Sequence, residues 1–130
     1  MKANEYFMQG YSCSESVVQE AIDKGLVPDS LLSCATSFSG GMGSGCLCGA
    51  IAGSQLVLGY LYGRNNKSGN DMLAREKARK FIEEFRKNHK ATCCRVLTAG
   101  LDMASKERKN HCQTMVSDCS RILNELIDNN

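Results

Sequence analysis

The amino-acid sequence predicts an all-α protein, a compact bundle of about five to six helices that forms a single domain over residues 1–130. Apolar residues recur at helical spacing along almost the whole chain, and no run of alternating apolar and polar residues is long enough for a strand. Hydrophobic residues make up 42% of the chain, which is enough to bury one core without crosslinks. We find no internal repeat, low-complexity tract or linker that would divide the domain.

Local signals define two helices at the start of the chain. A short helix is expected over residues 3–8. A second helix is expected over residues 13–24, because Ser12 and Glu15 form a capping box at its start. Gly25 then ends this helix, as glycine does at many helix C-termini.

The middle of the chain contains its one long apolar segment. We expect a third helix from Pro28 to Phe38, then the glycine-rich run 40–45, and then a helix over residues 49–63. The segment 46–63 has about the minimum length of a transmembrane helix, but Gln55 and four glycines interrupt it, and the mean hydropathy of the chain is −0.30. We therefore interpret it as a buried Gly/Ala-rich central helix, which neighbouring helices can approach closely.

Two further helices and one short helical segment are expected in the second half of the chain. Asp71 is predicted to cap a long helix with a charged outer face, and Thr92 a short one that contains the cysteines that follow it. The connection over residues 100–109 has no clear assignment. Asn110 and Gln113 form a weaker capping pair that opens a final amphipathic helix.

Four of the eight cysteines fall in the first turn of a predicted helix: Cys13, Cys48, Cys94 and Cys112. Unpaired N–H groups and a partial positive charge at a helix N-terminus favour the thiolate, so we expect Cys13 to have a lower pKa than Cys34, which lies in mid-helix. Cys13 and Cys112 also continue the apolar stripes of their helices and should point inward. The sequence therefore predicts one site built from the four thiols, at which redox or metal chemistry takes place.

The other four cysteines are expected to play different parts. Cys34 and Cys119 lie on apolar faces, where a free cysteine usually packs as a small core residue. Cys46 precedes Cys48 by two positions, so at most one of the two should reach a common site. The role of Cys93, directly before Cys94, is left open.

Several chemistries remain open at the four-cysteine site. The chain has no Cys-x-x-Cys pair, which removes the usual zinc-ribbon, thioredoxin-like and ferredoxin signatures. Four thiolates are nevertheless the ligand number of an iron–sulfur cluster or a structural zinc ion. A protein that cycles between dithiol and disulfide without a cofactor is the first alternative. A helical interaction module whose thiols are structural is the second.

The glycine run and the histidines offer weaker candidates. The run matches neither nucleotide-binding glycine motif, but the backbone of Gly41, Gly43 and Gly45 could form a nest for an anion or for cluster sulfides. His111, beside Cys112, could relay a proton or act as a ligand, although a helix-capping role at the surface is the simpler reading. His89 lies near the end of a long helix, where a cation is favourable.

Charge and cysteine content narrow the partners and the compartment. A net charge of +2 does not point to a nucleic acid, and we expect no membrane partner. The first residues lead into no apolar secretory segment, so we expect a reducing cytoplasm, where cysteines more often serve metal or redox roles. The sequence does not identify a redox partner and leaves a homodimer open.

The segment Cys48-Gly49-Ala50-Ile51-Ala52-Gly53 is a Cys-Gly-Ala-x-x-Gly element flanked by single cysteines. With Gly10-Tyr11-Ser12-Cys13 and the run 39–43 before it and Cys94-Arg95 and Cys112 after it, the chain resembles the C_GCAxxG_C_C family of redox-active proteins over residues 10–126. The resemblance places the family's four cysteines on Cys13, Cys48, Cys94 and Cys112.

This resemblance implies an oxidoreductase or an electron-transfer protein. A similar domain in a multihaem cytochrome with a split Soret band is assigned an iron–sulfur centre, which by analogy implies a cluster here. The chain departs from the family pattern in its additional cysteines and in Cys46-Leu47, where the family usually has small residues.

Overall fold

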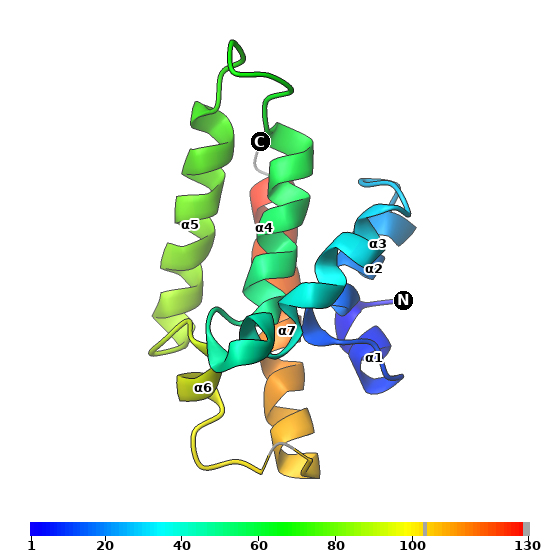
Figure 1. The fold of residues 1–130 in the computed structure, drawn as a ribbon, viewed down its shortest axis with the longest axis vertical. Helices are drawn as coiled ribbons and strands as arrows, with labels where there is room; N and C mark the ends of the chain where they lie inside the picture. Colours follow the sequence, from blue (N-terminus) through cyan, green and yellow to red (C-terminus); the bar gives the residue numbers. More distant parts are fainter. Residues whose placement is uncertain (103, 129–130) are drawn as a thin grey trace.

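The computed structural model describes residues 1–102 and 104–128 and confirms the all-α class (Figure 1). These residues form seven α-helices and no strand: α1 (Ala3–Met8), α2 (Cys13–Asp23), α3 (Leu31–Ala35), α4 (Gly49–Tyr62), α5 (Met72–Asn88), α6 (Cys94–Leu97) and α7 (Lys106–Asp128). A 3₁₀ turn at Thr36–Phe38 follows α3, and a distorted turn at Gly41–Gly45 precedes α4.

The three longest helices run along the long axis of the molecule, with α4 and α5 side by side and α7 beside them (Figure 1). Helices α1, α2 and α3 lie together on one side of this group, and the short α6 lies near the end of α5. Helix α4 packs against α2, α5 and α7, and eight of its fourteen residues are buried. Its N-terminal end points toward the region where the glycine-rich turn, α6 and α7 meet.

Large apolar side chains fill the core between the long helices. Phe81 and Phe85 of α5 are fully buried against Ile51, Leu58 and Ile122 and the other members of one contiguous cluster. Burial of a side chain of this size contributes about 1.5–3 kcal/mol to stability. This packing fixes α4, α5 and α7 relative to one another and so fixes the end of α4 on which Cys48 lies.

Two glycines of α4 allow α2 to approach closely. A Cβ atom at Gly53 would lie 2.7 Å from the carbonyl oxygen of Ser14 and 2.8 Å from Cγ2 of Val17. A Cβ atom at Gly49 would lie 2.5 Å from Sγ of Cys13. The Gly-Ala-x-x-Gly element is therefore a packing surface, and it places the start of α4 directly against the start of α2.

The last helix begins earlier than predicted. It starts at Lys106 rather than near Asn110, because the hydroxyl of Ser105 accepts a hydrogen bond from the N–H of Arg108 at 3.1 Å, as an N-cap does. Cys112 consequently lies two turns inside the helix. The prediction that Cys112 occupies a first turn is wrong.

Other predicted helix ends differ by smaller amounts. Cys93, rather than Thr92, is the residue before α6, since the carbonyl of Thr92 accepts the N–H of Cys48 at 2.8 Å. The Asp71 side chain does not cap α5 but pairs with Arg75, and Asn70 accepts the N–H of Met72 instead.

Within residues 1–102 and 104–128, no helix has the length and apolarity needed to cross a membrane.

Candidate functional site

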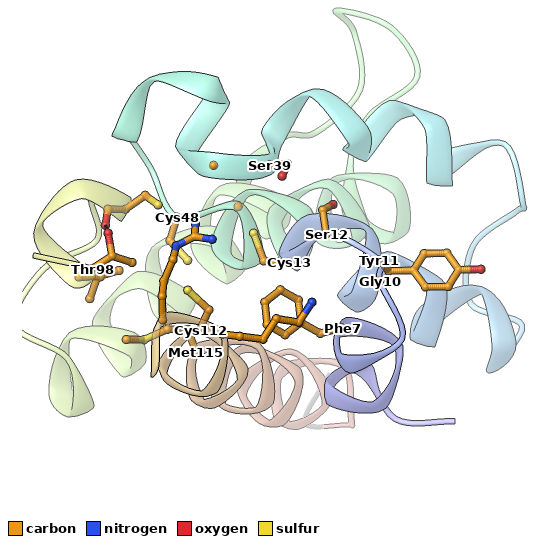
Figure 2. Close-up of a pocket in the computed structure, with 16 residues that line it drawn as sticks. Phe7, Gly10, Tyr11, Ser12, Cys13, Ser39, Cys48, Thr98, Cys112 and Met115 are labelled. Carbon is orange, nitrogen blue, oxygen red and sulfur yellow. Dashed lines mark hydrogen bonds between the residues drawn. The ribbon is translucent and has the colours of Figure 1, made fainter. Parts of the chain in front are cut away.

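A cavity of about 250 Å³ lies where the ends of several helices meet (Figure 2). All four cysteines predicted from the helix-start argument line it, and they come from four separate segments: Cys13 from α2, Cys48 before α4, Cys94 from α6 and Cys112 from α7. The labelled thiols of Cys13, Cys48 and Cys112 are grouped around the same space in Figure 2. Phe7, Gly40, Leu97, Thr98 and Met115 also contribute to its wall.

Cys13 is placed by the predicted capping box, which the structure confirms. The hydroxyl of Ser12 accepts the N–H of Glu15 at 3.2 Å, and the carboxylate of Glu15 accepts the N–H of Ser12 at 3.0 Å. Cys13 is therefore the first residue of α2. Because Gly49 has no side chain, the Cys13 sulfur lies against the start of α4, one residue after Cys48.

Backbone pairing between two distant segments places Cys48 and Cys94. Leu47 and Cys93 form an isolated antiparallel bridge, flanked by hydrogen bonds from the N–H of Cys48 to Thr92 at 2.8 Å and from the N–H of Cys94 to Cys46 at 2.5 Å. The bridge joins the start of α4 to the start of α6. It brings Cys48 and Cys94, which are far apart in the sequence, to one cavity.

The glycine loop, residues 40–46, supports this pairing. Gly40, Gly41, Met42 and Gly43 all have positive φ, so the chain makes a left-handed turn that only glycine adopts freely. A Cβ atom at Gly41 would lie 2.7 Å from Cβ of Cys94. The loop therefore packs its backbone directly against Cys94, and Met42 adopts the conformation required by its neighbours.

The three glycines predicted to form a backbone nest do not face the same space. Gly41 is buried behind Cys94, while Gly43 and Gly45 face a second cavity next to the first. Gly40 is the loop residue that lines the thiol cavity, and its N–H interacts with the thiol of Cys13 and favours the thiolate. The role of Gly41, Gly43 and Gly45 in holding a cofactor stays a prediction.

His111 links the two helices that carry Cys94 and Cys112. Its Nε2 lies 2.7 Å from the carbonyl oxygen of Leu97, the last residue of α6. The ring is partly buried and lies inside α7. The prediction that His111 caps a helix at the surface is therefore wrong. His111 holds α6 against α7 at the edge of the cavity.

Burial dominates the acid–base behaviour of the thiols. It raises the pKa of Cys13 and Cys112, and it raises the pKa of Cys48 to about 12. Backbone N–H groups of Ile51 and Ala50 favour the Cys48 thiolate but offset only part of this effect. The expectation that a helix N-terminus would lower the pKa of Cys13 is wrong, because removal of water from the thiol outweighs the N–H groups that face it.

Sequence reasoning missed the positive charge at the cavity. Arg108 and Lys109 line it, and the Arg108 guanidinium lowers the pKa of both Cys13 and Cys112 against the larger effect of burial. The Nζ atom of Lys109 lies 4.6 Å from the ring centre of Phe7. Recognition of Ser105 as an N-cap would have predicted the position of Arg108. A helix that begins at residue 106 places Arg108 one turn before Cys112 on the same face.

The four remaining cysteines lie outside the cavity. Cys119 is fully buried in the core, which confirms its packing role. Cys34 is exposed and its thiol donates to the carbonyl of Ser30 at 3.6 Å, so the prediction that it packs in the core is wrong. It lies on the outer side of the short α3. Cys46 and Cys93 are also exposed, and of the pair Cys46 and Cys48 only Cys48 reaches the cavity.

All eight cysteines are free thiols. In the part of the chain that the structure describes, no three His, Cys, Asp or Glu side chains are arranged as ligands of one metal ion. The four lining thiols thus share a cavity without forming a closed coordination shell.

Comparison with known proteins assigns a family. No curated protein and no solved structure matches the chain. The family model described as "Putative redox-active protein (C_GCAxxG_C_C)" matches residues 11–126 and so includes every element that lines the cavity except α1. The chain therefore belongs to the C_GCAxxG_C_C family of redox-active proteins.

Proposed function

We propose that Cys13, Cys48, Cys94 and Cys112 form one redox site that binds a metal ion or an iron–sulfur cluster and serves electron transfer to a partner protein. The observation that carries the proposal is that four thiols from four separate segments line a single cavity. The four exposed or core cysteines do not line it. The cysteines that line the cavity are thus the four that match the family pattern, and the four that lie outside it are the additional ones.

The four thiols are suitable ligands for a metal ion or an iron–sulfur cluster. Four thiolates are the usual ligands of a [2Fe–2S] or [4Fe–4S] cluster and of a structural zinc ion. A cluster, when bound, supplies one-electron chemistry at a potential that nearby N–H groups and burial adjust. The chain's own contribution is to hold the thiols, to exclude water with Phe7, Leu97 and Met115, and to direct the N–H groups of Gly40, Ala50 and Ile51 at the sulfurs.

The protonation state of the site follows from its burial. The raised pKa values of Cys13, Cys48 and Cys112 keep these thiols neutral at pH 7 when no cation is bound. Binding of a cation requires the thiolates and therefore releases protons, so affinity should fall as the pH is lowered. Arg108 offsets part of the negative charge that accumulates when several thiolates form.

The direct test is anaerobic purification of the full chain, followed by absorption spectroscopy and by iron, sulfide and zinc analysis. We expect a bound metal or cluster, and we expect its loss in each of the variants Cys13→Ser, Cys48→Ser, Cys94→Ser and Cys112→Ser. Cys93→Ser and Cys34→Ser are the matched controls, because both thiols are exposed and lie outside the cavity. Retention of the metal in the cavity variants, or equal loss in the controls, would refute the proposal.

A specific contact favours a second candidate, a cofactor-free dithiol/disulfide couple between Cys13 and Cys48. The Cys13 sulfur lies against Gly49, and a Cys13 thiolate raises the pKa of Cys48 more than any other charge does. Exchange with the disulfide of a partner protein would join these sulfurs, and the partner disulfide would take up the two electrons and two protons. A wild-type protein that is free of metal and forms a reversible Cys13–Cys48 disulfide would establish this candidate in place of the first.

A further inference from the structure

A second cavity of about 510 Å³ opens beside the thiol cavity, between the glycine loop and α6. Gly43, Ser44 and Arg95 line it and are exposed, so it reaches the surface. Gly40, Cys94 and Thr98 line both cavities. Cys94 thus stands in the wall between the buried thiols and a surface pocket, a position that none of the other three lining cysteines shares.

Arg95 supplies the charge of this pocket. Its Nη2 donates to the carbonyl of Ser44 at 3.0 Å, and its other N–H donors have no partner among the described residues. A Cβ atom at Gly45 would lie 3.2 Å from both Cβ and Nε of Arg95. The missing side chain of Gly45 therefore lets the guanidinium lie across the glycine loop, in a pocket that has no carboxylate in its lining.

We propose that this second cavity binds a small anionic disulfide, with a carboxylate on Arg95 and the sulfur–sulfur bond against Cys94. The Cys94 thiolate attacks one sulfur, the disulfide bond breaks, and a mixed disulfide forms on Cys94. The other half leaves as a thiolate, which takes up the proton that Cys94 lost. Guanidinium groups bind carboxylates through paired N–H donors, which makes Arg95 the group that selects the anionic disulfide.

The inference rests on the proposed function only in treating Cys94 as a redox thiol. It adds a consequence for that function. A mixed disulfide on Cys94 removes one of the four thiolates, so the oxidation of small thiols would control the binding of a metal or cluster.

The test is the rate of mixed-disulfide formation at Cys94, measured by mass spectrometry in a Cys93→Ser background, so that the peptide reports Cys94 alone. The reduced protein is treated with glutathione disulfide, which carries carboxylates, or with cystamine, a disulfide that carries amines. We expect Arg95→Gln to slow the glutathione reaction about two- to fivefold, the range expected for loss of one exposed ion pair, and not to slow the cystamine reaction. Arg86→Gln, an exposed arginine on α5 that lines neither cavity, is the control.

Three results would overturn the inference: no mixed disulfide at Cys94, equal slowing of both disulfides by Arg95→Gln, or the same effect from Arg86→Gln. Circular dichroism of each variant verifies that the helices are intact. Metal analysis of the wild-type protein reports on the proposed function separately. A protein that binds metal but shows no charge preference at Cys94 would contradict this inference alone.

Discussion

Two faces of α4 are built from different kinds of residue. Toward α5 and α7, large apolar side chains such as Phe81, Phe85 and Leu58 are buried in one cluster. Toward α2, Gly49 and Gly53 let the backbones approach closely, and at the N-terminal end of α4 four thiols line a cavity. The difference teaches that large apolar side chains stabilise one face of α4, while glycines on the other face let backbone and thiols come close together at the cavity.

The largest expected effect lies in the packed region. Phe81→Ala removes a fully buried ring and should lower the free energy of unfolding by about 3–5 kcal/mol, as measured by chemical denaturation followed by circular dichroism. The fraction that remains folded should bind metal with the wild-type stoichiometry, because Phe81 does not line the cavity. A smaller stability loss, below about 1 kcal/mol, would show that this region is not the main core.

The glycine contacts can be broken without removal of any side chain. Gly53→Ala forces a Cβ atom to within 2.8 Å of both the Ser14 carbonyl and Val17, so we expect a loss of about 1–3 kcal/mol. Gly59→Ala on the same helix is the matched control, because nothing lies within 4 Å of its Cβ position. This control should be neutral or stabilising by about 0.5–1 kcal/mol, through helix propensity. Equal effects at the two positions would contradict the close α2–α4 packing.

The buried thiols should make stability depend on pH in the alkaline range. The pKa of Cys48 rises from 9.0 to about 12 on folding, so above pH 9 the unfolded chain loses this proton while the folded protein keeps it. In the reduced, metal-free protein, stability is therefore fully present below pH 9 and is lost as the pH rises toward 12, by up to about 1.4 kcal/mol per pH unit for this thiol. Cys48→Ser should show a shallower decline in denaturation experiments between pH 8 and 11. Identical slopes would mean that the Cys48 thiol is not desolvated.

The smallest effect is expected outside both regions. Cys34→Ser and Cys93→Ser replace exposed thiols and should change the free energy of unfolding by less than about 0.5 kcal/mol. Thermal unfolding at neutral pH measures this directly. A clear loss of stability in either variant would show that the exposed cysteines take part in packing.

Helical periodicity and caps predicted most of the elements, because α2 and α5 each contain an amphipathic stripe that local sequence determines. The start of α7 was missed, since Ser105 caps it from a stretch with no apolar pattern. The pairing of Leu47 with Cys93 was not predictable, because a bridge of one residue pair leaves no alternating pattern in the sequence.

The sequence predicted that four cysteines come together, but it did not predict the electrostatics of the cavity that they line. Local signals identified four cysteines that line one cavity, yet the capping argument for Cys112 was incorrect, and its place in the cavity follows from the apolar stripe of α7. The pKa of Cys13 could not be predicted from its cap, because its burial depends on α4 and the glycine loop. The second cavity depends likewise on the tertiary contact between Gly45 and Arg95.

The measurement that tests the central claim most directly is alkylation of each cysteine in the native, metal-loaded protein, with and without a chelator, mapped by mass spectrometry. The four thiols should act as one unit, so Cys13, Cys48, Cys94 and Cys112 should be protected together and become reactive together when the chelator is added. Cys34, Cys46 and Cys93 should react in both conditions, because they are exposed. An alkylation pattern that the chelator leaves unchanged, or protection of only one or two of the four thiols, would contradict the account.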